Sequence, residues 1–271
     1  MRLALFTDQH FGPAASFDGK LRKLTHQAAS LTERFVSRMN LETKPDVVVN
    51  LGDVLEDESE ELDAQRYGQF LALVAELTCP VEHVIGNHDS ARLSDEKLAT
   101  MLGTPSLYRS TDIAGVHLVV LRSVERKDRD VRLPDEQLSW LREDLEQTQL
   151  PTLVCIHHPL SDLDLTGNRW FEKAPHICRV ANRREAREIL ERSGKVRAVF
   201  NGHAHWNHLD VVNGIPYVTL QSLIENVDDD APGRAAAAHA VVDVSAKRLI
   251  VNVFGEHPAH YQFDGPHQRL D

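Results

Sequence analysis

Five short clusters of metal-binding residue types are spread over the first three quarters of this 271-residue sequence. They read Asp8-Gln-His10, Gly52-Asp53, Gly86-Asn-His-Asp89, His157-His158 and Gly202-His-Ala-His205. Carboxylate and amide oxygens and imidazole nitrogens, with no thiolate among them, suit manganese, iron, zinc or cobalt better than copper or an iron–sulfur cluster. We therefore expect these clusters to form a metal centre.

Seven side chains form the candidate ligand set, which is more than the roughly four ligands that one zinc ion takes. Two ions that share one carboxylate would use all seven. Two ions about 3.5–4 Å apart lower the pKa of a shared water and hold the attacking and departing oxygens of an in-line displacement at phosphorus. Asp53 is the natural bridge, because Gly52 before it lets the backbone approach the ions closely. The candidate ligands are Asp8, His10, Asp53, Asn87, His157, His203 and His205.

Each cluster follows a short apolar run that is rich in β-branched residues, which predicts a buried strand. The runs are Leu3–Phe6, Val47–Leu51, Val81–Ile85, Thr152–Ile156 and Val196–Phe200. Helical spacing occurs between the runs, over Leu21–Met39, Leu62–Leu77, Asp135–Glu146 and Arg183–Arg192. Alternating strands and helices predict a largely parallel sheet, and ligands bind at the carboxyl ends of such strands. We therefore expect all five clusters to converge on one crevice.

The last quarter of the chain predicts short strands in antiparallel pairing, over Ile215–Leu220, His239–Val244 and Arg248–Phe254, and Val116–Leu121 could pair with them. Residues 256–271 show no periodicity and are interpreted as a C-terminal tail. The clusters extend from residue 8 to residue 205, and no stretch resembles a linker. We therefore expect residues 1–271 to form a single domain.

Composition excludes several classes of protein. Hydrophobic residues make up 42% and charged residues 26% of the chain, which is typical of a folded globular protein. The formal net charge of −11 repels a nucleic-acid backbone, so we expect no stable nucleic-acid binding. The longest apolar runs are far shorter than the roughly 20 residues that span a bilayer, and the N-terminus does not resemble a signal peptide. We expect a cytoplasmic protein that does not bind membranes, and the sequence leaves its oligomeric state open.

The five clusters, in this order, resemble the pattern of the calcineurin-like metallophosphoesterase superfamily: D-x-H, G-D, G-N-H-D/E, a lone H and G-H-x-H. The resemblance implies a mixed α/β fold, a four-layer αββα sandwich, and hydrolysis of a phosphoester by a hydroxide that bridges two divalent ions. Manganese, iron and zinc all suit these ligands, and we expect manganese. The resemblance assigns Asp8, His10 and His205 to one metal, Asn87, His157 and His203 to the other, and Asp53 to both.

The same resemblance places His88 against the phosphoryl oxygen or the leaving group rather than on a metal. Two nearby cations disfavour the charged form of a histidine, so a general acid and a neutral hydrogen-bond donor both remain possible roles. We expect Asp89 to orient His88. For His158, support of the site and simple packing at a strand end remain equal alternatives.

Residues 159–182 form a connection that is too long to be idle in a compact domain, and we interpret them as a lid over the metals. In this segment, Trp170 or Phe171 could stack on a base, and Arg169 or Arg179 could hold a second phosphate. An ordinary packed loop is the alternative.

The substrate is less well defined. Residues 214–225 look similar to the manganese-dependent ADP-ribose/CDP-alcohol diphosphatase branch and, less closely, to bacterial cyclic-nucleotide phosphodiesterases. We therefore expect a phosphodiesterase or diphosphatase that acts on small, nucleotide-like substrates. The alternative enzyme is a phosphomonoesterase, including a protein phosphatase. A non-catalytic metal-binding scaffold is the alternative from another class, but the presence of both Asn87 and His88 favours the enzyme.

Overall fold

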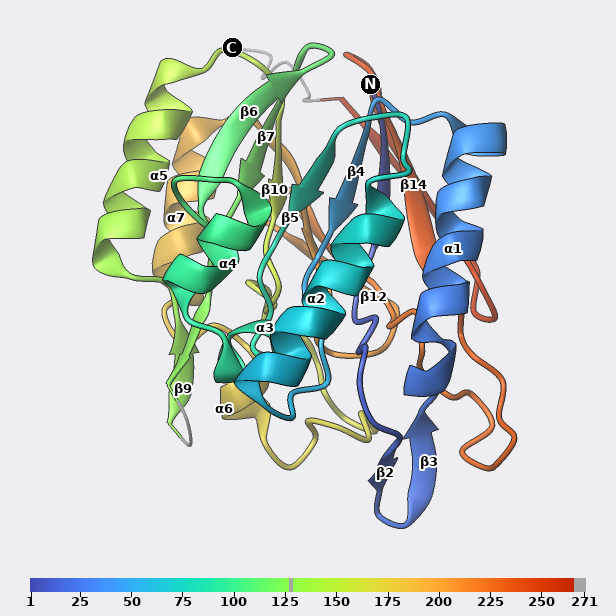
Figure 1. Ribbon diagram of the computed structural model, residues 1–271. Helices are drawn as coiled ribbons and strands as arrows, with labels where there is room; N and C mark the ends of the chain where they lie inside the picture. Colours follow the sequence, from blue (N-terminus) through green and yellow to red (C-terminus); the bar gives the residue numbers. More distant parts are fainter. Residues whose placement is uncertain (127–128, 266–271) are drawn as a thin grey trace.

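Two six-stranded β-sheets packed face to face form the centre of the computed structural model, which describes residues 1–126 and 129–265 (Figure 1). The first sheet has the order β16-β15-β14-β1-β4-β5, and the second has the order β12-β13-β11-β10-β7-β6. The strands of the first sheet are β1 (Arg2–Phe6), β4 (Val47–Asn50), β5 (Val81–His83), β14 (His239–Val244), β15 (Arg248–Phe254) and β16 (Ala259–Asp264). Those of the second are β6 (Arg109–Ile113), β7 (Val116–Val120), β10 (Thr152–Cys155), β11 (Val196–Asn201), β12 (His208–Val212) and β13 (Ile215–Thr219).

Both sheets have a parallel part extended by antiparallel strands. Strands β1, β4 and β5 are parallel in the first sheet, as are β7, β10, β11 and β13 in the second. The expected antiparallel pairing is correct for β14 and β15. It is incomplete for β13 and β7, which lie inside the second sheet and each have one parallel and one antiparallel neighbour.

Helices cover the outer face of each sheet, which confirms the four-layer αββα sandwich (Figure 1). Helices α1 (Ala28–Arg38) and α2 (Glu60–Val74) pack on the first sheet, and α5 (Asp135–Gln147) and α7 (Arg183–Ser193) pack on the second. The shorter elements are β2 (Ala15–Phe17), β3 (Lys20–Lys23), η1 (Thr25–Gln27), η2 (Met39–Thr43), α3 (Asp89–Arg92), α4 (Asp95–Leu102), β8 (Val124–Arg126), β9 (Asp130–Arg132) and α6 (Pro175–Cys178).

The central strands are apolar throughout because both of their faces are buried. In β1, Leu3 and Leu5 pack between the two sheets, whereas Ala4 and Phe6 pack beneath the helices. Side chains alternate in the same way in β4, where Val47 and Val49 face the other sheet and Val48 faces the helices. This burial explains why the strands that carry the clusters appear in the sequence as continuous apolar runs.

Two predicted boundaries were wrong. Residues 20–23 form strand β3 instead of the start of a helix, because they pair with β2 across a turn whose left-handed residues are Asp18 and Gly19. The expected C-terminal tail over 256–271 contains β16, which pairs with β15 along its whole length. As an edge strand, β16 buries alternate side chains only partly, so its apolar signal is weak; residues 266–271 lie outside the described part of the chain. Within the described residues, no helix is long and apolar enough to cross a membrane.

Candidate metal centre

The five polar clusters follow the carboxyl ends of five parallel strands, and the structure brings them together. Asp8 and His10 follow β1, Asp53 follows β4, and Asn87 lies four residues after β5. His157 follows β10, and the pair His203 and His205 follows β11 in the second sheet. Donor atoms from both sheets therefore meet at one edge of the sandwich, as the strand-end argument predicts.

Five of the seven candidate ligands have a left-handed backbone, which non-glycine residues adopt rarely and at a cost on the order of 1–2 kcal/mol each. These residues and their φ angles are Asp8 (54°), His10 (46°), Asp53 (53°), His203 (68°) and His205 (54°). Strained backbone of this kind gathers at functional sites, where the surrounding structure holds it in place. The left-handed turns spread side chains two residues apart around one point.

Glycines in the clusters allow parts of the chain to come unusually close. A Cβ atom on Gly202 would collide with the Thr7 hydroxyl and with Oδ2 of Asp8. A Cβ atom on Gly86 would collide with the backbone nitrogen and the carboxylate of Asp53. These glycines therefore allow the carboxylates to reach their positions.

Asp8, His10 and His205 form the first donor group. The Nε2 atoms of His10 and His205 lie 3.1 Å apart, and Asp8 Oδ1 lies 3.3 Å from Nε2 of His205 and 3.9 Å from that of His10. Two ligands about 2.1 Å from one ion, at an angle of 90–110°, lie roughly 3.0–3.4 Å from each other. Asp8 Oδ1 is buried and has no hydrogen-bond partner among the described residues, as expected for a metal ligand.

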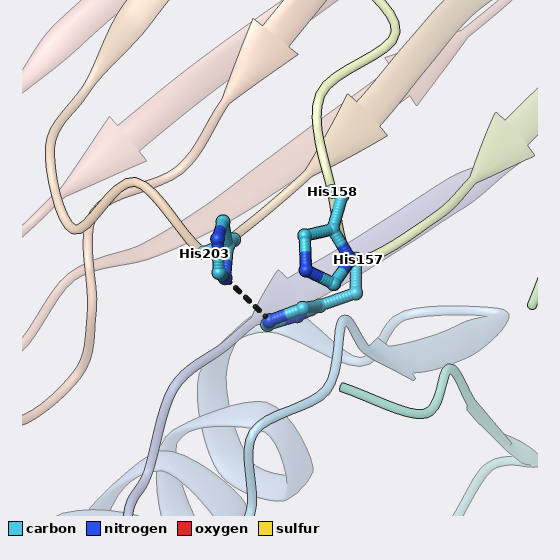
Figure 2. A group of neighbouring side chains, drawn as sticks. All are labelled: His157, His158 and His203. Carbon is cyan, nitrogen blue, oxygen red and sulfur yellow. Dashed lines mark hydrogen bonds between the residues drawn. The ribbon is translucent and has the colours of Figure 1, made fainter. Parts of the chain in front are cut away.

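His157, His203, Asp53 and Asn87 form the second group. Figure 2 shows His157 and His203 pointing toward each other from two chain segments, with His157 Nε2 3.1 Å from His203 Nδ1. Nε2 of His157 also lies 3.2 Å from Asp53 Oδ2. Oδ1 of Asn87 is buried and, within the described residues, has no partner. The carboxylates of Asp8 and Asp53 and the ring of His157 also form one close group, which places Asp53 between the two sets.

His158 lies against this second group. Its ring lies beside that of His203 (Figure 2), with the centroids 4.1 Å apart. Its Nδ1 lies 2.8 Å from the Ser123 hydroxyl. Its Nε2 is buried and unpartnered among the residues that the structure describes. His157, His158 and His203 thus form a third close group of donor atoms, which favours a role in the site over simple packing.

The four imidazoles of the ligand set are oriented by an acceptor on the ring nitrogen that faces away from the donor groups. Such a partner fixes the tautomer, so that the opposite nitrogen offers its lone pair to a metal. The pairs are His205 Nδ1 with Glu225 Oε2 at 2.7 Å, His10 Nδ1 with Glu56 Oε2 at 2.8 Å, His157 Nδ1 with the Leu51 carbonyl at 2.9 Å, and His203 Nε2 with the Ile177 carbonyl at 3.2 Å. The sequence analysis did not identify Glu56 or Glu225. Glu225 is fully buried, which is the structural sign of its role.

The pKa shifts show that the carboxylates of this centre need positive charge to balance them. Burial raises the pKa of Asp8, but the charge of His205, its hydrogen bond and the charge of His157 together hold that pKa below its usual range. Burial disfavours the charged forms of His157 and His205, yet the neighbouring Asp53 and Asp8 raise the pKa of each to about 9. Protons on these two imidazoles balance the carboxylates. A divalent ion would displace those protons, so the donor set fits the metals that its chemistry suggests.

His88 is held by a carboxylate that the sequence analysis did not identify. Its Nδ1 lies 2.7 Å from Oδ1 of Asp57, and its backbone N–H donates to Asp53 Oδ1 at 2.9 Å. Burial lowers the pKa of His88, but the charge of Asp53 and the hydrogen bond to Asp57 raise it above its usual value.

The expectation that Asp89 orients His88 was wrong. The Asp89 carboxylate accepts hydrogen bonds from the backbone N–H groups of Asp53, Leu55 and Gly86, at 2.9–3.1 Å. It is fully buried beneath these loops, at the start of α3, so it supports their shape instead of contacting the His88 ring.

A cavity of about 260 Å³ opens over the donor groups. Trp170 and Phe171 form part of its wall, with ring centroids 5.3 Å from that of His205 and 4.5 Å from that of His203. A second cavity, of about 390 Å³, is lined by Asp57, Ser90 and Arg92, among others. Both cavities are lined by Asn87 and His88, so His88 borders open space in each of them.

The structure does not place the expected phosphate-binding arginines in the cavity. Arg169 pairs with Glu225, at 2.9 Å, and with Asp229, and Arg179 donates to the Asp162 carbonyl at 3.1 Å. Among the described residues, Lys23 is the lysine that lines the cavity, with its Nζ 2.7 Å from Glu56 and 5.3 Å from the centre of the Trp170 ring. The sequence did not indicate this position of Lys23, because residues 21–23 were predicted to begin a helix.

Comparisons with known proteins agree with this geometry. The family model "Calcineurin-like phosphoesterase" matches residues 1–207. A "Probable cyclic nucleotide phosphodiesterase" of Synechococcus is 29% identical over 214 residues, which are 76% of this chain and 73% of that protein. A "cAMP/cGMP dual specificity phosphodiesterase" of Mycobacterium tuberculosis is 28% identical over 178 residues, or 64% of this chain and 52% of that protein.

Among solved structures, a dimetal phosphatase from Danio rerio has the same fold. Its TM-score is 0.78 over 97% of this chain and 98% of that chain, at 16% sequence identity. The family match covers most of the chain, including all five clusters. The chain therefore belongs to the calcineurin-like phosphoesterase family and is a metal-dependent phosphoester hydrolase.

Proposed function

We propose that this protein is a two-metal phosphodiesterase that acts on small, nucleotide-like substrates, with manganese as its preferred metal. The observation that carries the proposal is the pair of cavities that both border His88, the first of which lies over the donor groups. A phosphodiester has an organic group on each side of the phosphorus, so it can use both spaces. The relatives named as cyclic nucleotide phosphodiesterases support the same class of substrate.

The chain's own residues have separate tasks in this proposal. When bound, the two ions supply Lewis acidity that activates water and offsets charge on the phosphoryl oxygens. The seven candidate ligands would hold the ions, and Asp53 is proposed to serve both donor groups. His88 donates a proton or hydrogen bond from Nε2 to the departing oxygen, and Asp57 fixes the ring through Nδ1.

Residues 159–182 are proposed to cover the substrate. Trp170 and Phe171 provide an aromatic wall beside the donor groups, which suits a nucleobase. Asn168 anchors this segment, because its side-chain amide donates to the Ala204 carbonyl at 2.8 Å, between the two histidines of the last cluster. Lys23 adds positive charge for a substrate phosphate. A cytoplasmic location remains a prediction.

Rates on bis(p-nitrophenyl) phosphate and p-nitrophenyl phosphate test the proposal, measured with manganese, zinc, iron and magnesium. We expect faster turnover of the diester, the highest rate with manganese, and two ions per chain by elemental analysis. A panel of cyclic nucleotides, ADP-ribose, CDP-alcohols and glycerophosphodiesters then identifies the substrate. Preference for the monoester would favour a phosphomonoesterase, and absence of turnover with every metal would contradict the proposal.

Asp53→Asn tests the bridging role. The substitution removes the charge shared by the two donor groups, so we expect it to lower activity by at least about 100-fold and to reduce metal content. Activity and elemental analysis are measured on the same preparation. Near-normal values of both would show that Asp53 does not bridge the ions.

A further inference from the structure

A third cavity, of about 480 Å³, lies between α1, the segment before β14, and the ends of β14 and β15. None of the seven candidate ligands lines it. Leu31, Phe35 and Leu223 provide apolar lining, and three arginines surround it: Arg34, Arg38 and Arg234. We call it the arginine cavity. Its lining combines positive charge with an apolar floor.

The described side chains that line the arginine cavity carry more positive than negative charge. Arg34 and Arg38 are one helical turn apart on α1, where like charges repel each other. Arg38 lies over the Phe254 ring and pairs with Glu42 at 3.3 Å, and Arg234 pairs with Asp228 at 3.0 Å and with Glu256. Exposed Arg34 has no ion-pair partner within the described residues. Glu256 is the one carboxylate among the described residues that line the cavity.

A cavity of similar size between α5 and α7 provides a comparison. It has a volume of about 460 Å³, and its basic side chains are matched by an equal number of acidic ones. The basic residues are Arg142, Arg192 and Lys195, and the acidic residues are Glu146, Glu185 and Glu188. The excess of positive charge in the arginine cavity is therefore a local feature, in a chain whose formal net charge is −11.

His239 gives the arginine cavity an unused polar group. The residue is only 7% exposed, and its ring stacks on Phe254 with centroids 5.1 Å apart. Its Nδ1 faces the Ala237 carbonyl at 3.3 Å, which can only accept a hydrogen bond, so Nδ1 carries the hydrogen. Nε2 is then a bare acceptor, buried and without a partner among the described residues. His239 is therefore a buried polar residue at the floor of the cavity, held between the Phe35 and Phe254 rings.

We propose that the arginine cavity is an accessory binding site for a small amphipathic anion. The carboxylate, sulfonate or phosphate of this ligand would pair with Arg34 and Arg38, and its apolar or aromatic body would pack on Leu31 and Phe35. The site shares no lining residue with the seven candidate metal ligands. A test of ligand binding there is therefore independent of the proposed phosphodiesterase activity.

Calorimetric titration of the full chain with naphthalene-1-sulfonate tests the site. We expect one binding event per chain. Sulfate alone and neutral 1-naphthylmethanol should each bind at least tenfold more weakly, because each offers only half of the required chemistry. If either binds as tightly as the sulfonate, the cavity is not a site for an amphipathic anion.

Variants locate the binding event. Arg34→Gln combined with Arg38→Gln should weaken binding of naphthalene-1-sulfonate at least tenfold, and Arg34→Glu alone should weaken it similarly. The matched control is Arg142→Gln with Arg192→Gln in the charge-balanced cavity, which should leave the affinity unchanged. Arg34 is exposed, so its substitution should preserve folding, and far-UV circular dichroism checks this. Unchanged affinity in both α1 variants would overturn the proposal.

Discussion

His88 differs from the other histidines of the motifs, because a carboxylate orients it toward open space instead of toward the donor groups. Asp57 holds its Nδ1 at 2.7 Å, and about a quarter of each side chain is exposed to solvent. Nε2 is therefore left free in a residue that lines both cavities, and in the proposed reaction it would donate to the departing oxygen. The ligand histidines, by contrast, are almost completely buried.

His88→Ala should lower kcat by roughly 10²–10⁴-fold and leave the metal content unchanged, because the variant loses a proton donor and no ligand. The loss should be larger for alkyl diesters than for p-nitrophenyl diesters, whose leaving group needs little protonation. Asp57→Asn should cause a smaller loss with the same dependence on leaving group. Rates across a leaving-group series, with elemental analysis, measure both effects; loss of a metal from His88→Ala would show that His88 is a ligand.

Glu225→Gln should weaken metal binding by about 10–100-fold, because Glu225 orients His205 and carries the charge that favours its metal-binding tautomer. Competition with a fluorescent chelator measures the affinity. Glu188→Gln, an exposed carboxylate on α7, is the matched control and should bind metal normally. Equal affinities in the two variants would show that the contact with Glu225 does not tune the site.

At the scale of residues, the candidate metal ligands can be recognised in the sequence, but the side chains that orient the histidines cannot. The donors lie in short motifs with fixed spacing, so Asp8-x-His10 and Gly202-His-x-His205 are visible without a structure. Glu225 lies 20 residues from His205, and Asp57 lies 31 residues from His88. No local pattern links such pairs, because only the folded chain brings them together.

At the scale of elements, the end of each central strand turns sharply into a loop that carries ligands. Left-handed residues and tightly approached glycines make these turns possible. Parallel strands buried on both faces have a strong sequence signal, so their ends could be predicted. The β2–β3 hairpin and β16 are short or half-exposed and lack this signal, which explains the incorrect helix start and the incorrect tail.

Gly202→Ala should destabilise the protein by about 1–3 kcal/mol and weaken metal binding, because the new methyl group must displace Thr7 or Asp8. Gly68→Ala is the control: this exposed glycine of α2 has free space around it, and the change should stabilise the protein by roughly 0.5–1 kcal/mol. Urea unfolding measures both. A neutral Gly202→Ala variant would show that the loop relaxes easily.

At the scale of the whole molecule, the metal centre joins the two sheets. Asp8, His10, Asp53 and Asn87 follow strands of the first sheet, and His157, His203 and His205 follow strands of the second. Ions bound by both sets would link the halves of the sandwich. Each ion present at 100 times its Kd would stabilise the fold by about 2.7 kcal/mol.

Removal of the ions with a chelator should therefore lower the Tm by roughly 5–10 °C in scanning calorimetry. The Asp53→Asn variant should show a smaller difference between loaded and chelated protein. An unchanged Tm after verified metal loss would mean that the two sheets do not depend on the ions.

The difference in Tm between the loaded and chelated forms should widen as the pH rises. In the ion-free fold, His157 and His205 have pKa values of about 9, above the ordinary value of 6.5. Their protons stabilise the ion-free fold fully below pH 6.5, and this contribution is lost as the pH rises toward 9. Over the same range fewer protons compete with the ions, so the loaded form gains. A constant difference between pH 6 and pH 9 would contradict this linkage.

The apolar layer between the sheets has a consequence for reactivity. Leu3 and Val49 of one sheet and Leu118 and Leu153 of the other belong to this layer, and none of them lines the cavity over the donor groups. Because each donor group takes ligands from both sheets, the thickness of this apolar layer affects how closely the ligands of each proposed ion approach one another. A methyl group gained or lost deep in the sandwich can therefore change the geometry of the site and the rate of the reaction. Variants with improved activity should be sought among apolar residues that do not contact a substrate.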